Sequence, residues 1–339
     1  MKNPLFKIRE KGKYGFINAE GNIVIEPQYF EAEDFYNDFS RVRFNNKLVP
    51  LDHLGRLLMK HSFNHVGYFE EGLAMAQLVN LWGYIDQRGS IAIDIQFEEV
   101  GDFRRGIAPA GNIGQMGYID KTGNFTIAPT FQKTTEFTGD LAAVMQNDLY
   151  GFINQQGDIL IQPQFEGATS FQGNIATITQ ADKWGAIDKN GEMLFEPQFE
   201  IIDGFSEGEF FDGVALISKD EKYGYIDDQG NTIVDPIYDF AGDFGEGLAL
   251  VEINNSFGYI DRQGKLAILP KFEDAGVFSE GLAQVKVDGK WGYINTDGDF
   301  AIPALFEEVQ PFKNGLAWMS SGDQWGYIDR YGESIWKEV

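Results

Sequence analysis

Glycine recurs about every 34 residues along this chain of 339 residues, usually behind an aromatic residue and ahead of Tyr or Phe. The recurring glycines are Gly15, Gly83, Gly117, Gly151, Gly185, Gly224, Gly258, Gly292 and Gly326. The step from Gly15 to Gly83 covers two periods, with a degenerate copy around Val49, so we count ten copies of one repeat. Such a period predicts a solenoid, propeller or array, because one repeat is too small to bury its own apolar face.

Repeat 9, residues 281–312, shows the local pattern of the copies. Residues 282–287 alternate as a β-strand does, and the Asp288-Gly289 pair that follows is a strong hairpin signal. Residues 291–295 and 300–302 read as two further strands, separated by a second turn. Each repeat is therefore predicted to be a three-stranded antiparallel meander, followed by a connector to the next copy.

The second turn is the most regular element, since Asp or Asn opens it and Gly closes it in all ten copies. A side-chain oxygen at the first position can accept a backbone N–H two residues on, and Gly adopts the positive φ that ends the turn. Calcium ligation is the alternative for these residues. A calcium site needs six to eight oxygen ligands, however, and each turn supplies one or two, so we favour the turn interpretation.

The strand that carries the recurring glycine is apolar on both faces, which predicts that each small sheet is covered by a sheet on either side. The glycine itself is expected to leave room for a neighbouring aromatic residue or backbone segment to approach closely, and its recurrence fits face-to-face stacking of successive repeats. Two rows of aromatic residues in the connectors are expected to form core between repeats, with Phe137 and Phe278 as examples of the second row. The predicted fold is all-β, with ten tandem meanders stacked face to face as an open curved solenoid. A closed β-propeller is the alternative.

The consensus of the copies, GLAxVxxxGKWGYIDxxGxxxIxPxF, resembles the WG (or KWG) repeat family of bacterial proteins. The segments Trp82–Asp86, Trp291–Ile294 and Trp325–Asp329 carry its signature, and the resemblance covers essentially the whole chain. It implies an all-β repeat module that acts as a binding or scaffolding element, and it transfers no catalytic residues. Residues 1–339 are thus expected to form a single repeat array, with a degenerate repeat at 39–72 and a five-residue insertion within 206–213.

Charge and composition restrict the partners. Asp and Glu outnumber Lys and Arg by 52 to 27, giving a net charge of −25, and no basic patch stands out. We therefore expect neither nucleic acid nor an anionic membrane as a partner. The chain has no Cys, no apolar run of signal-peptide length near its start and no stretch long enough for a membrane helix. A cytoplasmic protein without a cofactor is expected, and its oligomeric state stays open.

Two irregularities interrupt the repeats, and such departures often map to binding loops. The degenerate repeat carries all three histidines, His53, His61 and His65, which are weak candidates for a metal site. No metal is predicted, because nothing in their spacing requires them to converge. The insertion adds Phe210 and Phe211 beside Glu207 and Glu209, and these four are the candidate partner-binding residues. A bulged loop with its rings folded back is the alternative for the insertion.

No phosphate loop, nucleophile elbow or zinc helix appears, and repeated acidic pairs such as Glu98-Glu99 suggest a solvated face, so no enzyme activity is expected. The predicted function is a scaffold that mediates protein–protein interaction through an acidic repeat surface. The alternative is a small-ligand or glycan-binding module that uses aromatic stacking. Shielding of Trp82, Trp184, Trp291 and Trp325 from solvent, which we expect, would disfavour that alternative.

Overall fold

The computed structural model describes residues 4–58, 63–201, 209–211, 213–322 and 324–338. These residues form β-strands, turns and connecting segments; none is helical, so no helix in the described ranges could span a membrane. The contacts divide the chain into two compact units. The first comprises Met1–Asn18, Asn22–Ala181 and Ala186–Glu192, and the second comprises Ala19–Gly21, Asp182–Gly185 and Met193–Val339.

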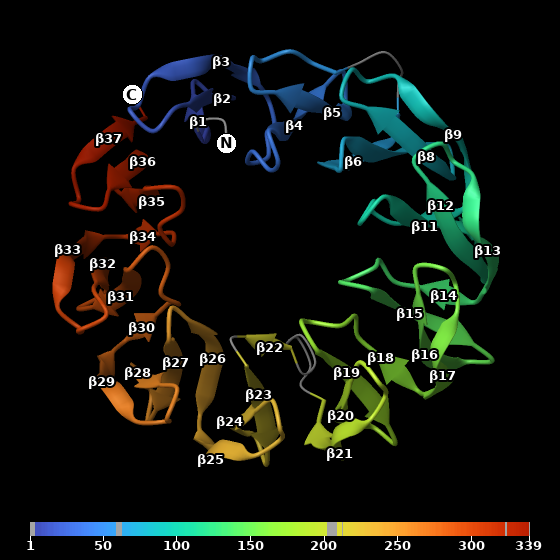
Figure 1. Cartoon of the computed structure of the whole chain (residues 1–339). Coiled ribbons are helices and arrows are strands. Elements are labelled where there is room, and N and C mark those ends of the chain that lie inside the picture. The colour runs from blue at the N-terminus through green and yellow to red at the C-terminus, as the bar shows by residue number, and fades with distance from the viewer. Residues whose placement is uncertain (1–3, 59–62, 202–208, 212, 323, 339) are drawn as a thin grey trace. The chain divides into compact units, whose positions relative to one another are not determined.

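Each repeat forms one small antiparallel sheet, and the described residues contain ten of them in chain order (Figure 1). The sheet of repeat 1 contains β1 (Phe6–Glu10), β2 (Lys13–Ile17) and β3 (Ile23–Tyr29), and that of repeat 2 contains β4 (Phe39–Phe44) and β5 (Lys47–Asp52). The sheet of repeat 3 contains β6 (His65–Glu70), β7 (Leu73–Leu78), β8 (Leu81–Asp86) and β9 (Ile91–Phe97). Repeat 4 has β10 (Glu99–Val100), β11 (Ile107–Asn112), β12 (Gln115–Asp120) and β13 (Phe125–Phe131), and repeat 5 has β14 (Lys133–Thr134), β15 (Leu141–Gln146), β16 (Leu149–Asn154) and β17 (Ile159–Phe165).

The division between the compact units falls within repeat 6 along the chain. The sheet of repeat 6 contains β18 (Gly167–Ala168), β19 (Ile175–Gln180), β20 (Lys183–Asp188) and β21 (Met193–Glu200), and that of repeat 7 contains β22 (Phe210–Phe211), β23 (Val214–Lys219), β24 (Lys222–Asp227) and β25 (Thr232–Tyr238). The sheet of repeat 8 contains β26 (Phe240–Gly245), β27 (Leu248–Ile253), β28 (Ser256–Asp261) and β29 (Leu266–Phe272). Repeat 9 has β30 (Asp274–Ala275), β31 (Ala283–Val287), β32 (Lys290–Ile294) and β33 (Phe300–Phe306), and repeat 10 has β34 (Glu308–Val309), β35 (Leu316–Ser321), β36 (Gln324–Asp329) and β37 (Ser334–Lys337).

The structure confirms the all-β class of tandem antiparallel meanders, a repeat type shared by open solenoids and β-propellers, and it adds a fourth strand to most sheets. This strand comes from the connector: in β10, Glu99 pairs with Gly111 and Val100 with Ala110 of β11. It is usually only two residues long, too short for alternation to predict it from the sequence. Its consequence is that the connector becomes an edge of the following sheet.

Apolar side chains of consecutive sheets meet in shared cores, as the two apolar faces of the central strand predict. Between repeats 3 and 4, for example, Tyr84 and Ile93 of one sheet pack with Ala108 and Ile119 of the next. Phe103 of the intervening connector fills the same core and is 1% exposed. Within each compact unit, neighbouring sheets are therefore stacked face to face.

A ring pair recurs at these junctions between the aromatic residue after the recurring glycine and the connector phenylalanine. The rings of Tyr118 and Phe137 lie 4.9 Å apart, and those of Tyr293 and Phe312 lie 4.8 Å apart. The buried Tyr118 hydroxyl also donates a hydrogen bond to the carbonyl oxygen of Thr135, at 2.9 Å. The connector is thereby held by an aromatic contact and by a hydrogen bond.

A backbone segment does approach the recurring glycine closely, as predicted, but it belongs to the third strand of the same sheet and not to a neighbouring repeat. A Cβ atom on Gly117 would lie 2.4 Å from the carbonyl oxygen of Ile127 in β13. The register explains this: Met116 pairs with Phe131 and Tyr118 with Ile127, so the third strand bulges toward the glycine. Only a residue without a side chain fits under such a bulge.

Candidate functional site

Acidic residues outnumber basic residues, and they fall into sets with different contacts. In the second turn of repeat 4, Asp120 accepts the backbone N–H groups of Thr122 at 2.8 Å and Asn124 at 3.1 Å. Hydrogen bonds from the Thr122 hydroxyl and from these amides lower the pKa of Asp120. The turn interpretation is confirmed, and no group of three or more His, Cys, Asp or Glu in the described ranges could hold a metal ion.

A second set of acids caps the first hairpin of the repeats. Glu98, just after β9, accepts the backbone N–H of Ile113 at 3.0 Å, and Glu166, after β17, accepts that of Ala181 at 2.8 Å. Asp239 and Glu273 do the same for Asn254 and Gly289 in the second compact unit. These carboxylates satisfy N–H groups that the hairpin turn leaves without a strand partner.

A third set joins consecutive repeats through an acid before the Gly-Leu-Ala segment. Glu71 accepts the backbone N–H groups of Arg105 at 2.6 Å and Gly106 at 3.0 Å, which belong to the next repeat. Partial burial opposes ionisation of Glu71, but Lys121 and these two amides together lower its pKa. Glu280 makes the equivalent bonds to Asn314 and Gly315. These glutamates therefore stabilise the stack rather than mark a site.

A fourth set places like charges beside one another. Asp102 and Glu136 occupy equivalent positions in consecutive connectors, and a Glu136 carboxylate oxygen lies 3.2 Å from the backbone nitrogen of Asp102, whose N–H it accepts. Desolvation, then the negative charges of Glu136 and Glu70, raise the pKa of Asp102. In the second compact unit, desolvation and the charge of Glu209 raise the pKa of Asp243. The charges of Glu136 and Glu209 therefore oppose ionisation of Asp102 and Asp243, while Glu136 also satisfies a backbone N–H.

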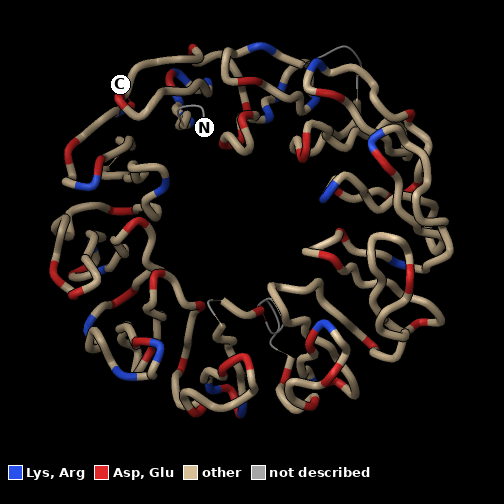
Figure 2. Tube along the Cα trace, in the orientation of Figure 1, with Lys and Arg blue, Asp and Glu red and all other residues tan. Residues whose placement is uncertain are grey.

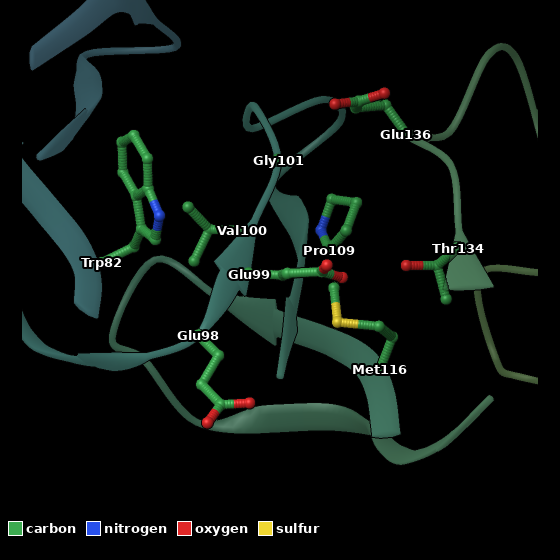
Figure 3. Close-up of a pocket in the computed structure, with 9 residues that line it drawn as sticks. All are labelled: Trp82, Glu98, Glu99, Val100, Gly101, Pro109, Met116, Thr134 and Glu136. Atoms are coloured by element: carbon green, nitrogen blue, oxygen red, sulfur yellow. The ribbon is translucent and has the colours of Figure 1, made fainter. Parts of the chain in front are cut away.

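Glu136 of the Asp102–Glu136 pair lines a pocket of about 270 Å³ in the first compact unit (Figure 3). Its lining residues come from repeats 3, 4 and 5 and are Trp82, Glu98, Glu99, Val100, Gly101, Pro109, Met116, Thr134 and Glu136. In Figure 3 the Glu99 side chain points between Pro109 and Met116, toward the middle of the pocket. Sequence reasoning did not find this pocket. One signal was present: Met116 stands where most repeats carry Trp, Tyr or Phe.

The candidate residues of the insertion do not share one environment. The Phe210 ring is partly buried and lies 6.5 Å from the ring of Trp184 and 6.5 Å from that of Phe195. Phe211, next to it on β22, is 36% exposed. Glu209 lies close enough to Asp243 to act on its carboxyl. Glu207 lies outside the described residues.

The two described histidines of the degenerate repeat contact different residues. His53 lies beside Asp38, with Nε2 3.3 Å from a carboxylate oxygen, and its ring packs at a tilt against Phe35. His65, on β6, lies edge-on to Trp82 with 5.6 Å between ring centroids. Its pKa is lowered by desolvation and by the positive charge of Arg41. His61 is outside the described residues.

A polar cluster beside His65 was also missed by sequence reasoning. Arg41 donates to both carboxylate oxygens of Glu33, at 2.6 and 3.0 Å, and the Tyr68 hydroxyl donates to Glu33 at 2.6 Å. The guanidinium group lies 4.3 Å from the centroid of the Tyr68 ring and also donates to the carbonyl oxygen of Val66 at 2.9 Å. This cluster joins repeats 2 and 3 where the usual glycine and tyrosine are absent.

The repeat pattern decides the family. The pattern described as WG containing repeat matches residues 14–47, 82–111, 116–150, 150–184, 184–223, 223–256, 257–291 and 291–325. The chain belongs to the WG containing repeat family. Residues 48–81 are left out of the match, and they cover the degenerate part of repeat 2. A β-repeat array of this family indicates a scaffold or binding role.

A solved structure shares the fold of these WG repeats at low sequence identity, and others show a weaker similarity. A crystal structure described as the eukaryotic initiation factor is 12% identical, with a TM-score of 0.58, and the match covers 100% of this chain and 96% of the other. BamB from Moraxella catarrhalis is 12% identical, with a TM-score of 0.39 and coverage of 90% and 95%. No curated protein matches the sequence.

The tryptophans that begin the WG motif are less uniform than expected. Trp184 is 1% exposed and packs among Phe195 and Phe199. Trp82, Trp291 and Trp325 are instead partly exposed. The expected shielding therefore holds for Trp184 and is incomplete for the other three.

Proposed function

We propose that the chain is a non-enzymatic scaffold that binds a protein partner through the acidic surface of its WG repeats. The observation that carries the proposal is the set of like charges in consecutive connectors, Asp102 beside Glu136 and Asp243 beside Glu209. Several other surface acids accept backbone N–H groups or pair with cations. Glu136 also accepts a backbone N–H, but its charge and that of Glu209 oppose ionisation of Asp102 and Asp243. Local features that cost stability are typical of functional positions.

The wider charge distribution supports the same proposal. Figure 2 shows Asp and Glu recurring through the repeats of both compact units, with fewer Lys and Arg between them. A surface that repeats one charge at regular spacing attracts a basic partner, orients it during the encounter and makes the association rate depend on salt.

The test begins with the purified full chain as bait in its native lysate, with captured proteins identified by mass spectrometry. Each captured protein is then purified and its affinity for the chain is measured between low and high salt. We expect a stoichiometric basic partner whose affinity falls steeply as salt rises. A partner bound with no salt dependence, or no direct binder among the captured proteins, would contradict the proposal.

The insertion offers a second contact for the same partner. Phe211 is 36% exposed at the end of β22, beside the acidic pair of Glu209 and Asp243. Because Phe210 packs near Trp184, the informative variant is Phe211→Ser alone. We expect Phe211→Ser to weaken binding of the partner while leaving the urea midpoint nearly unchanged. Full binding by this variant would remove the insertion from the interface.

A small-ligand or glycan-binding module is the second candidate, and the partial exposure of Trp82, Trp291 and Trp325 favours it. An exposed indole can serve as a stacking platform for a sugar or a planar ligand. Quenching of tryptophan fluorescence by acrylamide, measured with and without a glycan panel, tests this candidate. Protection of the fluorescence by a glycan would support it, and quenching that no glycan changes would contradict it.

A further inference from the structure

We propose that the pocket between repeats 3, 4 and 5 receives the guanidinium group of an arginine, carried on an extended basic segment of the partner protein. This inference rests on the proposed function and deepens it, since it assigns one specific contact within the acidic surface. The size of the pocket, its apolar walls and its charge support this assignment.

The size favours a single side chain. The pocket holds about 270 Å³, just under the roughly 300–1,000 Å³ typical of pockets for small molecules and cofactors. Trp82, Val100, Pro109 and Met116 give it apolar and aromatic walls. The three-carbon stem of an arginine can lie against such walls while its charged end remains among polar groups.

The charge favours a cation. Glu98, Glu99 and Glu136 line the pocket, and none of its described lining residues is basic. Two of these carboxylates already accept backbone N–H groups, Glu98 from Ile113 and Glu136 from Asp102. Glu99, which points into the middle of the pocket, is the natural partner for an entering cation (Figure 3). A cation there would also relieve the repulsion between Glu136 and Asp102.

The combination of an indole and a carboxylate favours arginine over lysine. A planar guanidinium group can stack on an aromatic face and donate two parallel hydrogen bonds to one carboxylate, whereas an ammonium group acts as a point charge. Trp82 supplies the aromatic face, and Glu99 and Glu136 supply the carboxylates.

Repeat 4 differs from eight of the other repeats at Met116, a residue that lines the pocket. The position before the recurring glycine holds Tyr14, Trp82, Tyr150, Trp184, Tyr223, Phe257, Trp291 and Trp325 in other repeats. Met116 occupies it in repeat 4, and a flexible thioether there can adapt to an incoming side chain. Met116 therefore distinguishes the lining of this pocket from the corresponding position in those eight repeats.

The test uses the full chain, labelled at the methionine ε-methyl groups, and a short Gly/Ser peptide with one central arginine. A matched peptide carries citrulline, which keeps the shape and removes the charge. We expect the arginine peptide to shift the Met116 methyl resonance, assigned with Met116→Leu, and the citrulline peptide to leave it in place. Glu99→Gln is expected to weaken binding about fivefold, the effect of losing one favourable charge contact.

Glu308→Gln is the matched control, because Glu308 is the equivalent exposed residue on β34, where it pairs with Ser320 as Glu99 pairs with Gly111. Unchanged binding by Glu308→Gln supports the pocket. Equal weakening by both variants, a Met116 methyl that does not move, or equal binding of the citrulline peptide would overturn it. Equal weakening by both variants would contradict the arginine pocket but not the proposed acidic scaffold. The scaffold proposal is tested separately, by the salt series with the purified partner.

Discussion

The junction between repeats 4 and 5 and the junction between repeats 2 and 3 hold neighbouring sheets together by different chemistry. At the first, the Tyr118 ring packs on Phe137 and its hydroxyl bonds to the Thr135 carbonyl. At the second, Pro50 stands at the position of that tyrosine. Arg41 and its partners supply the polar contacts instead.

The apolar contact persists at both junctions. Phe69, the connector phenylalanine of repeat 2, is 3% exposed and lies 4.3 Å from the ring of Phe39. Repeat 2 keeps this packing although its sheet has only the two strands β4 and β5. The comparison indicates that stacking depends on the row of connector phenylalanines more than on the WG motif itself.

The largest expected effect comes from removing a member of that row. Phe137→Ala should lower the free energy of unfolding by about 4 kcal/mol, because it opens a cavity in a core where the ring is 3% exposed. Urea denaturation measures the loss. Phe300→Ala is the control, since Phe300 is 47% exposed and should cost less than about 1 kcal/mol. Similar losses for the two variants would refute the dominance of the connector row.

The polar contacts at the junction between repeats 2 and 3 should contribute less to the free energy of unfolding. Arg41→Met removes the two-pronged pair with Glu33 and the bond to the Val66 carbonyl, and should cost about 2 kcal/mol. Arg105→Met is the control: its pair with Asp140 spans 3.0 Å between side chains that are 53% and 78% exposed, so it should change stability by less than about 1 kcal/mol. If Arg41→Met were as mild as this control, the cluster would not hold the junction.

The same cluster predicts a pH effect. Partial burial acts to raise the pKa of Glu33, but hydrogen bonds from Arg41 and Tyr68 outweigh it and leave that pKa below its ordinary value. Stability from this carboxylate is present at neutral pH and is lost as pH falls through the lowered pKa. Denaturation of Arg41→Met should therefore depend less on acid pH than that of the wild-type chain.

At the junction between repeats 4 and 5, a smaller effect distinguishes the contribution of the Tyr118 hydroxyl to stability from that of its ring. Tyr118→Phe keeps the aromatic contact and removes the bond to the Thr135 carbonyl, so it should cost about 1 kcal/mol. Repeat 5 carries Phe152 at this position, and its ring still lies 4.8 Å from that of Phe171. Tyr331→Phe, at a residue 78% exposed, is the control and should be neutral. A neutral Tyr118→Phe would show that the ring alone holds the connector.

The regular junctions could be predicted from the sequence, because a period of 34 residues repeats each constraint many times. The Asp or Asn turns and the buried Phe rows follow from local chemistry and from alternation along a strand. Glu33, Arg41 and Tyr68 could not be predicted, since they converge from different connectors and strands at a position that occurs once. The pocket at Met116 depends on how three sheets are stacked, which the sequence pattern alone does not specify.

The smallest expected effect concerns the repelling acids and connects the scaffold to its function. Desolvation and the charges of Glu136 and Glu70 raise the pKa of Asp102, so the folded chain binds its proton more tightly than the unfolded chain does. The contribution of Asp102 to the free energy of unfolding is therefore most favourable at acid pH. It is lost as pH rises from the ordinary aspartate pKa through the raised value. Asp102→Asn should stabilise the chain at pH 7 by less than about 1 kcal/mol, with no gain well below pH 4.

Urea denaturation at several pH values, compared with Asp94→Asn at an exposed position of β9, measures this difference. A gain at pH 7 that disappears in acid would show that the fold carries a repulsive charge at its own expense. That cost is expected of a surface kept for binding a cation, and the same variant should bind a basic partner more weakly. If Asp102→Asn stabilised the chain equally at every pH, the charge would not be the cause, and this link between stability and binding would be lost.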